Sequence, residues 1–172
     1  MHPKEARKIK NGTGRLTHLS LKNSEIFVGI DFTQDKKINA ILQTHTSYVL
    51  YPSLSSIDIA KEPLPSSEKR AIFIIDATWA CAKKILRMSS NLQDVPHISF
   101  THTEVSKFQI KEQPNEYCLS TMESTLKVVN LLNDSSEDTS DFLEPFLKMN
   151  SMQLKAIEDH ANDFNKNRLR RR

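Results

Sequence analysis

The sequence is poor in glycine, with only three in 172 residues. Gly12, Gly14 and Gly29 form neither a GxGxxG element nor a P-loop. Their scarcity disfavours a Rossmann dinucleotide site and a nucleoside triphosphatase, because both need glycine-rich turns around phosphate. A nucleotide-like cofactor would have to be held by loops of another kind.

Cysteine is also scarce, and Cys81 and Cys118 stand far apart. This spacing predicts neither a disulfide framework nor a CxxC metal site, and the six histidines lack metal-ligand spacing. No apolar run approaches the roughly 20 residues of a membrane span, and no signal peptide opens the chain. We therefore expect a cytoplasmic protein with no metal site and no membrane partner.

The charge is unevenly distributed. The chain carries a net +3, but residues 1–22 and 166–172 each carry +5, which leaves −7 for residues 23–165. Basic ends on an acidic body suit a polyanionic partner such as RNA, since phosphate neutralisation drives non-specific nucleic-acid affinity. Charged termini are equally typical of solvated tails.

The length fits one domain over residues 1–172. Continuously apolar, β-branched or aromatic runs predict buried strands at Glu25–Asp31, Ser47–Pro52, Ala71–Asp76 and Val95–Phe100. Apolar residues three or four apart predict helices at Lys36–Thr44, Thr78–Asn91, Ser120–Asn133 and Asp141–Asn165. Alternating strands and helices predict an α/β fold with a mostly parallel sheet and flanking helices.

One candidate site follows the third predicted strand. Asp76 ends that strand, and Thr78 and Trp79 follow as a helix begins. Open α/β sheets bind ligands at the carboxyl ends of their strands, where a carboxylate can take a ligand proton. The alternative is structural, because Asp and Thr are ordinary cap residues and a lone tryptophan is often a core anchor.

A second candidate lies where the third predicted helix begins. Ser120-Thr121-Met122-Glu123 has the S-x-x-E form of a capping box, in which Ser120 and Glu123 cap each other's backbone amides. Such a helix start retains backbone donors that suit the carboxylate or ribose of a cofactor. Capping alone also explains the pattern.

Two basic segments are candidates for RNA contact. In Ser106–Pro114, an extended chain would place Lys107 and Lys111 on one side, where both could meet phosphate, although an edge strand with solvated lysines is the alternative. In Asn11–Arg15, glycine-freed amides and Arg15 could cradle an anion, although a plain turn is the alternative.

Taken in order, these elements resemble the DTW-domain family from Met1 to about Asn133. The resemblance rests on six motifs in this order: His2-Pro3-Lys4-Glu5, Asn11-Gly12-Thr13-Gly14-Arg15-Leu16, Tyr51-Pro52-Ser53, Asp76-Ala77-Thr78-Trp79, Ser106-x-Phe108-x-Ile110-Lys111 with Gln113-Pro114, and Leu119-Ser120-Thr121-Met122-Glu123. The most specific part is the pair of Asp-x-Thr-Trp and Leu-Ser-Thr-x-Glu in that order.

The resemblance implies a SPOUT-like fold with a C-terminal trefoil knot, in which the chain around Ser106–Thr121 threads a loop. It also implies transfer of the 3-amino-3-carboxypropyl group of S-adenosylmethionine to N3 of a tRNA uridine. The residues implied at the reaction centre are Asp76, Thr78 and Trp79, with Asp76 the candidate base and Glu123 the alternate. Those implied to hold the cofactor are Ser53, Phe100, Ser120 and Thr121.

Two departures and two rival functions accompany this expectation. Relatives usually begin with a cysteine-rich, zinc-ribbon-like segment that is absent here, and their Asn-Thr-Gly-Arg is one residue longer in this chain.

The rival functions are a SPOUT-type RNA methyltransferase and a non-catalytic RNA-binding module. The sequence predicts neither the modified tRNA position nor the oligomeric state.

Overall fold

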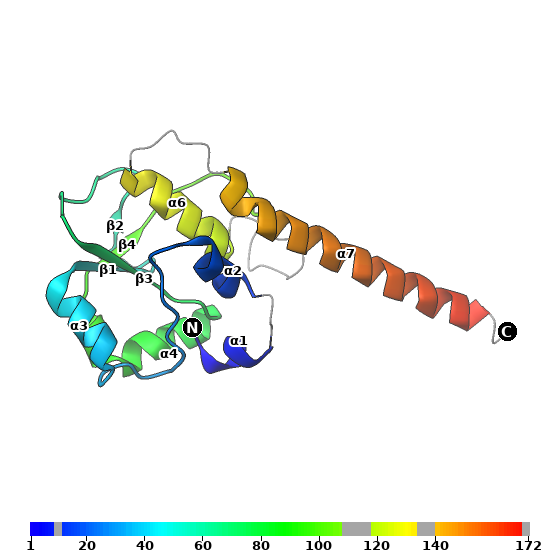
Figure 1. Ribbon diagram of the computed structural model, residues 1–172, viewed down its shortest axis with the longest axis horizontal. Helices are drawn as coiled ribbons and strands as arrows, with labels where there is room; N and C mark the ends of the chain where they lie inside the picture. The colour runs from blue at the N-terminus through cyan, green and yellow to red at the C-terminus, as the bar shows by residue number, and fades with distance from the viewer. Residues whose placement is uncertain (9–11, 108–117, 134–139, 170–172) are drawn as a thin grey trace.

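The chain folds around a central β-sheet with helices on both faces (Figure 1). The computed structural model describes residues 1–8, 12–107, 118–133 and 140–169. Within them the elements are, in chain order, α1 Pro3–Lys8, α2 Thr13–Ser20, α3 Lys36–Thr44, β1 Thr46–Leu50, β2 Ile57–Asp58, β3 Arg70–Ile74, α4 Trp79–Met88, α5 Ser90–Gln93, β4 His97–Ser99, α6 Thr121–Asn133 and α7 Ser140–Leu169. The expected α/β architecture is confirmed.

The sheet has the strand order β2-β4-β1-β3, and each neighbouring pair is parallel. Leu50 of β1 lies opposite Ile74 of β3 on one side and Ile98 of β4 on the other. Because the strands run in the same direction, their carboxyl ends lie along one edge of the sheet. The loops that follow the strands begin at that edge.

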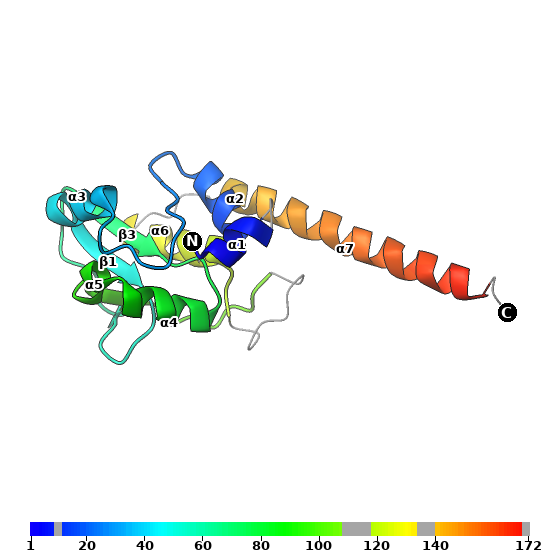
Figure 2. The same ribbon diagram turned by 90° about the horizontal axis from the view of Figure 1, so that it is seen from below.

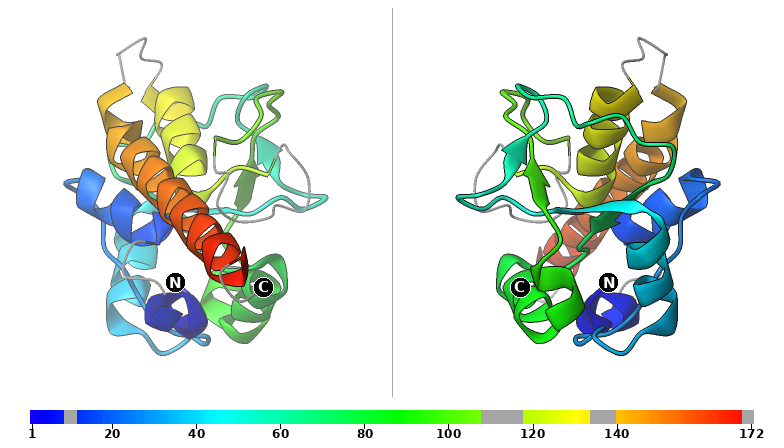
Figure 3. Two further views of the ribbon diagram at one scale, coloured as in Figure 1. Left: turned by 90° about the vertical axis from the view of Figure 1, so that its right-hand side faces the viewer. Right: turned by 90° about the vertical axis from the view of Figure 1, so that its left-hand side faces the viewer.

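Each face of the sheet has its own apolar core, because successive strand residues point to opposite faces. Ile72 packs in the core that includes Val128 of α6, whereas Phe73 packs in the core that includes Ile38 of α3 and Ile85 of α4. Figure 3 shows α6 on one side of the sheet and α3 and α4 on the other. Burial of both faces explains why the strand sequences are apolar without alternation.

Local contacts explain where helices begin and end. Asp35 caps α3, since its carboxylate accepts two backbone N–H groups of the first turn at 3.0 Å. The helix predicted over Thr78–Asn91 is divided into α4 and α5 at Ser89. The buried Ser89 hydroxyl accepts the Phe32 backbone N–H at 3.0 Å, so this break reflects a tertiary contact.

The strand predicted over Glu25–Asp31 is wrong, because this segment lies outside the sheet. Its Phe27 side chain packs against the α3–α4 core. Its backbone pairs elsewhere: the Gly29 N–H donates to the Met1 carbonyl at 3.2 Å, and the Phe27 carbonyl accepts the Met1 amine at 2.8 Å. Apolar residues can thus be buried by a loop. Strand β2, which the sequence did not predict, has only two residues.

The loop predicted over Asn11–Arg15 is also partly wrong, because residues 13–15 form the first turn of α2. Gly12 is the N-cap residue, with the extended backbone angles φ −68° and ψ 147° that any residue adopts. Asn11 lies outside the described residues.

Helix α7 starts on the body of the protein and then extends away from it (Figures 1 and 2). Phe146 is fully buried, and the Asn150 side chain donates to the Lys107 carbonyl at 3.0 Å. Farther along, Met152 and Ile157 are exposed. No helix in the described part of the chain has the length and apolarity that crossing a membrane requires. The expected knot involves residues 108–117, which lie outside the described residues.

Candidate active site at the carboxyl ends of the strands

The residues expected at the site follow the carboxyl ends of three strands. Ser53 follows β1, Asp76 follows β3 and Phe100 follows β4, while Thr121 begins α6. This edge is where parallel α/β sheets bind ligands.

Asp76 and Thr121 are in direct contact. The Thr121 hydroxyl donates to Asp76 Oδ1 at 2.8 Å, across 45 positions of the sequence. The Asp76 backbone carbonyl accepts the His2 N–H at 3.1 Å. The Asp-x-Thr-Trp and Leu-Ser-Thr-x-Glu motifs, the most specific pair of the resemblance, thus meet just after the end of β3.

Glu123 forms the capping box predicted at the start of α6. Its Oε2 accepts the Ser120 N–H at 2.8 Å, and the Ser120 hydroxyl accepts the Glu123 N–H at 3.3 Å. The carboxylate also accepts the Ser106 hydroxyl at 2.9 Å and the Lys107 N–H at 2.6 Å. Glu123 is 8% exposed, so this carboxylate fastens the loop after β4 to α6.

Trp79 is half exposed at the start of α4. Its ring lies edge-on to that of Tyr51, with 6.1 Å between the centroids. Thr78, the N-cap residue of α4, is also exposed, and its side chain makes no capping hydrogen bond. A core-anchor role does not explain Trp79, because an anchor would be buried.

Tyr51, which contacts Trp79, also contacts His97 of β4. Its ring lies 5.7 Å from that of His97, and His97 Nδ1 lies 3.3 Å from the Ser53 hydroxyl. Burial lowers the pKa of His97. His97 Nε2 is buried and makes no hydrogen bond within the described part of the chain. Ser53 is itself exposed.

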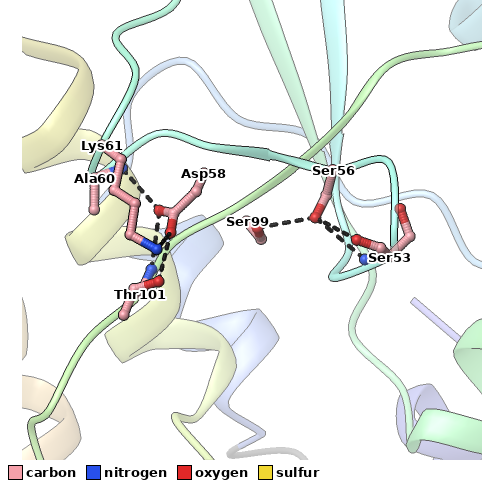
Figure 4. A network of polar contacts seen from close by, with 7 residues as sticks. All are labelled: Ser53, Ser56, Asp58, Ala60, Lys61, Ser99 and Thr101. Carbon is pink, nitrogen blue, oxygen red and sulfur yellow. Dashed lines mark hydrogen bonds and ion pairs between the residues drawn. The ribbon is translucent and has the colours of Figure 1, made fainter.

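A polar network connects the loops after β1, β2 and β4 (Figure 4). The Ser56 hydroxyl donates to Ser99 Oγ at 2.9 Å, and it accepts the Ser53 N–H at 3.2 Å. Asp58 of β2 accepts both the backbone N–H and the hydroxyl of Thr101. The network therefore holds the segment next to Phe100.

Asp58 is a residue that sequence reasoning missed, because an isolated aspartate in a two-residue strand gives no signal. Its hydrogen bond from the Thr101 hydroxyl holds the pKa of the carboxyl well below its usual range. Its contact with Lys61, at 3.1 Å, acts in the same direction. Phe100 packs against the α6-side core and lies 5.5 Å from the His102 ring.

The structure describes two of the three basic residues that were expected to contact RNA. Arg15 on α2 and Lys107 are both exposed, as contact with phosphate requires. The Arg15 side chain lies 3.5 Å from the Ala6 carbonyl. Lys111 lies outside the described residues. In the described residues, no three His, Cys, Asp or Glu side chains gather in a group that could hold a metal.

Residues 1–154 match the model of a protein family described as "DTW domain". The chain is 28% identical over 129 residues to tRNA-uridine aminocarboxypropyltransferase 2 of Drosophila melanogaster, which is 74% of this chain and 51% of that protein. It is 25% identical over 157 residues to the Macaca fascicularis protein of the same name, covering 89% and 53% of the two chains. The chain thus spans about half the length of these curated relatives. No solved structure matches it significantly.

Proposed function

The chain belongs to the DTW domain family, and on this premise we propose that it transfers the 3-amino-3-carboxypropyl group of S-adenosylmethionine to N3 of a tRNA uridine, releasing methylthioadenosine. The relatives' names, tRNA-uridine aminocarboxypropyltransferase 2, support the class of reaction. We also propose one domain over residues 1–172, with a SPOUT-like knot around residues 106–121.

The observation that carries the proposal is the hydrogen bond between Thr121 and Asp76. It joins the Asp-x-Thr-Trp element to the Leu-Ser-Thr-x-Glu element at the edge of the sheet where ligands bind. The bond thus brings side chains from two separate loops together at this edge, as a ligand site of an α/β sheet requires.

The residues at this edge fit S-adenosylmethionine in chemical type. The aromatic rings of Tyr51 and Trp79 suit a cationic sulfonium and a planar base. The exposed Ser53 hydroxyl supplies a polar group, and His97 Nδ1 lies 3.3 Å from it. We propose that Ser53, Phe100, Ser120 and Thr121 hold the cofactor.

When bound, S-adenosylmethionine supplies a methylene carbon made electrophilic by its sulfonium. Uracil N3 is a poor nucleophile while it carries its proton. We assign Asp76 as the base that takes this proton, with Thr121 orienting the carboxylate through Oδ1. Alignment of donor and acceptor can lower the barrier by about 7–11 kcal/mol. A positioned base typically accelerates the reaction ~10²–10⁴-fold, which corresponds to only about 3–5 kcal/mol. Most of the catalysis then comes from how the loops are held.

Glu123 was the alternative candidate for the base. Its carboxylate already accepts three hydrogen bonds and is nearly buried. Its oxygens are thus already occupied in holding Ser106, Lys107 and Ser120 around the start of α6. These contacts give Glu123 a positioning role, and Asp76 is retained as the proposed base.

We propose tRNA as the acceptor, with its phosphates bound by Arg15, Lys107 and Lys111. The side chains of Arg15 and Lys107 are exposed, so their charges are accessible to the phosphates of a polyanion. The basic ends of the sequence would add non-specific affinity.

The test is mass spectrometry of tRNA nucleosides after incubation of unmodified tRNA with the protein and S-adenosylmethionine. We expect aminocarboxypropyl-uridine and an equal amount of methylthioadenosine. A methylated nucleoside with S-adenosylhomocysteine would contradict the proposal in favour of a methyltransferase. Binding of tRNA without consumption of the cofactor would instead indicate a non-catalytic module.

A further inference from the structure

Gly14 of α2 lies directly against the side chain of Asp76. A Cβ atom built on Gly14 would stand 2.6 Å from Asp76 Cγ and 3.1 Å from Asp76 Cβ, and closer still to Oδ2. Carbon atoms in ordinary contact are about 3.5–4.0 Å apart. No residue with a side chain fits at position 14 unless Asp76 or α2 moves.

We propose that Gly14 is a positioning residue for the transfer reaction, which sets the place of the Asp76 carboxylate by letting α2 approach it without a side chain. The inference rests on the proposed function, because it assigns Gly14 a role through the proposed base. It places the α2 backbone beside Asp76 Oδ2, in addition to the hydrogen bond that Thr121 donates to Oδ1.

Backbone conformation does not explain a glycine at this position. Gly14 is the second residue of α2, and its φ is not in the left-handed region. Alanine is intrinsically the better helix former at such a position. The close approach to Asp76 is therefore the feature that requires glycine.

The Asp76 carboxylate cannot turn away from a side chain at position 14 without losing other contacts. Gly14 and Thr17 are the buried residues of α2, and this helix packs on α6, which carries Thr121. A carboxylate that turned away from a new methyl group would leave the 2.8 Å hydrogen bond from Thr121. If α2 moved instead, its contacts with α6 would open. Either change alters the surroundings of Asp76.

The first experiment is the steady-state kinetics of Gly14→Ala with tRNA and S-adenosylmethionine. We expect kcat to fall about 100-fold, as for a 1 Å misplacement of a reacting group, with less change in the KM for tRNA. An unchanged kcat would overturn the inference.

Gly29→Ala is the matched control. A Cβ on Gly29 would stand 2.8 Å from Phe32 Cε1 and 3.1 Å from Cζ, so this variant also forces a steric conflict, although a smaller one than at Gly14. Phe32 belongs to the core with Ile38 and Ile85. Gly29→Ala should lower the melting temperature and leave kcat near that of the wild type. An equal loss of kcat in both variants would show that a general loss of packing explains the effect.

A double variant separates positioning from stability. If Gly14 acts through Asp76, Gly14→Ala should reduce the residual activity of Asp76→Asn by less than threefold, although it costs the wild type about 100-fold. Residues that act as a unit are non-additive. Multiplicative losses would contradict a role through Asp76.

A crystal structure of Gly14→Ala gives a result that does not depend on activity. We expect Asp76 and Thr121 beyond hydrogen-bond distance, or α2 displaced from α6, even if the wild type transfers nothing to tRNA. An intact 2.8 Å hydrogen bond with α2 in place would overturn the inference. An inactive wild type with a displaced Asp76 in the variant would contradict only the proposed function.

Discussion

Replacement of Asp76 by asparagine separates proton transfer from structure at this site. Asparagine keeps the size of the side chain, and its amide oxygen can still accept the Thr121 hydroxyl that lies 2.8 Å away in the wild type. It cannot take a proton from uracil N3. Asp76→Asn should therefore stay folded and bind S-adenosylmethionine, yet lose transfer.

The expected loss is about 10²–10⁴-fold in kcat, the usual contribution of a positioned base. The hydrogen bond from Thr121 keeps its geometry but loses its charged acceptor, which costs about 1 kcal/mol for that bond. The partly buried Met1 amine also loses the attraction of the Asp76 charge. A purely structural Asp76 would show the reverse, with lower stability and activity largely kept. Melting temperature, cofactor affinity by calorimetry and yield of aminocarboxypropyl-uridine should be measured on the same preparations.

Asp35→Asn is the matched control, because the same chemical change is made to a carboxylate that caps α3. Asparagine and aspartate are similar N-caps, so this variant should match the wild type in both stability and transfer. Near-normal yield from Asp76→Asn would refute the assignment of Asp76 as base. Loss of yield in both variants would show that the assay reports misfolding.

Three further variants test other parts of the site. Asp58→Asn should make the free energy of unfolding fall less steeply at acidic pH. The pKa of Asp58 is depressed in the folded protein, so the stability that its carboxylate contributes is present above the unfolded pKa of about 3.9 and is lost as pH falls through the folded pKa. Equal slopes of stability against pH in the variant and the wild type would contradict this. Trp79→Ala should lower kcat/KM about 10- to 100-fold, because the site loses ~1–3 kcal/mol of stacking on the exposed ring. A fall in melting temperature as large as that from removing a core tryptophan would show that Trp79 is structural instead. Glu123→Gln should reduce the free energy of unfolding by about 1–3 kcal/mol, because the Lys107 and Ser120 N–H groups lose a charged acceptor. Unchanged stability in denaturant titrations would show that Glu123 does not fasten the loop after β4 to α6.

Helix α3 was predicted from residue 36 to residue 44, as the structure has it. Its amphipathic pattern and the Asp35 cap are local, so no distant contact is needed to place it. The segment Glu25–Asp31 has an equally apolar sequence, yet it lies outside the sheet. Hydrophobicity specifies burial, whereas sheet pairing depends on which backbone partners the fold brings near.

In the candidate site, too, local contacts could be predicted from the sequence, whereas contacts between distant segments could not. The capping box of Ser120 and Glu123 spans four residues and could be predicted, because its bonds are local. The bonds from Ser106 and Lys107 to the same carboxylate could not, because they depend on how the loop after β4 returns to α6. The expected position of Lys111 lies outside the described residues.

By itself the sequence determined the α/β class, the absence of a glycine-rich phosphate loop and the order of the motifs that mark the DTW family. Only the tertiary structure decided that Thr121 donates to Asp76 and that Gly14 leaves room for its carboxylate. These contacts join residues 45 and 62 positions apart, so they arise only after the sheet and the helices on its faces have packed. Periodicity and capping act over a few residues, whereas the geometry of the site is set by the packing of α2 and α6 at the edge of the sheet.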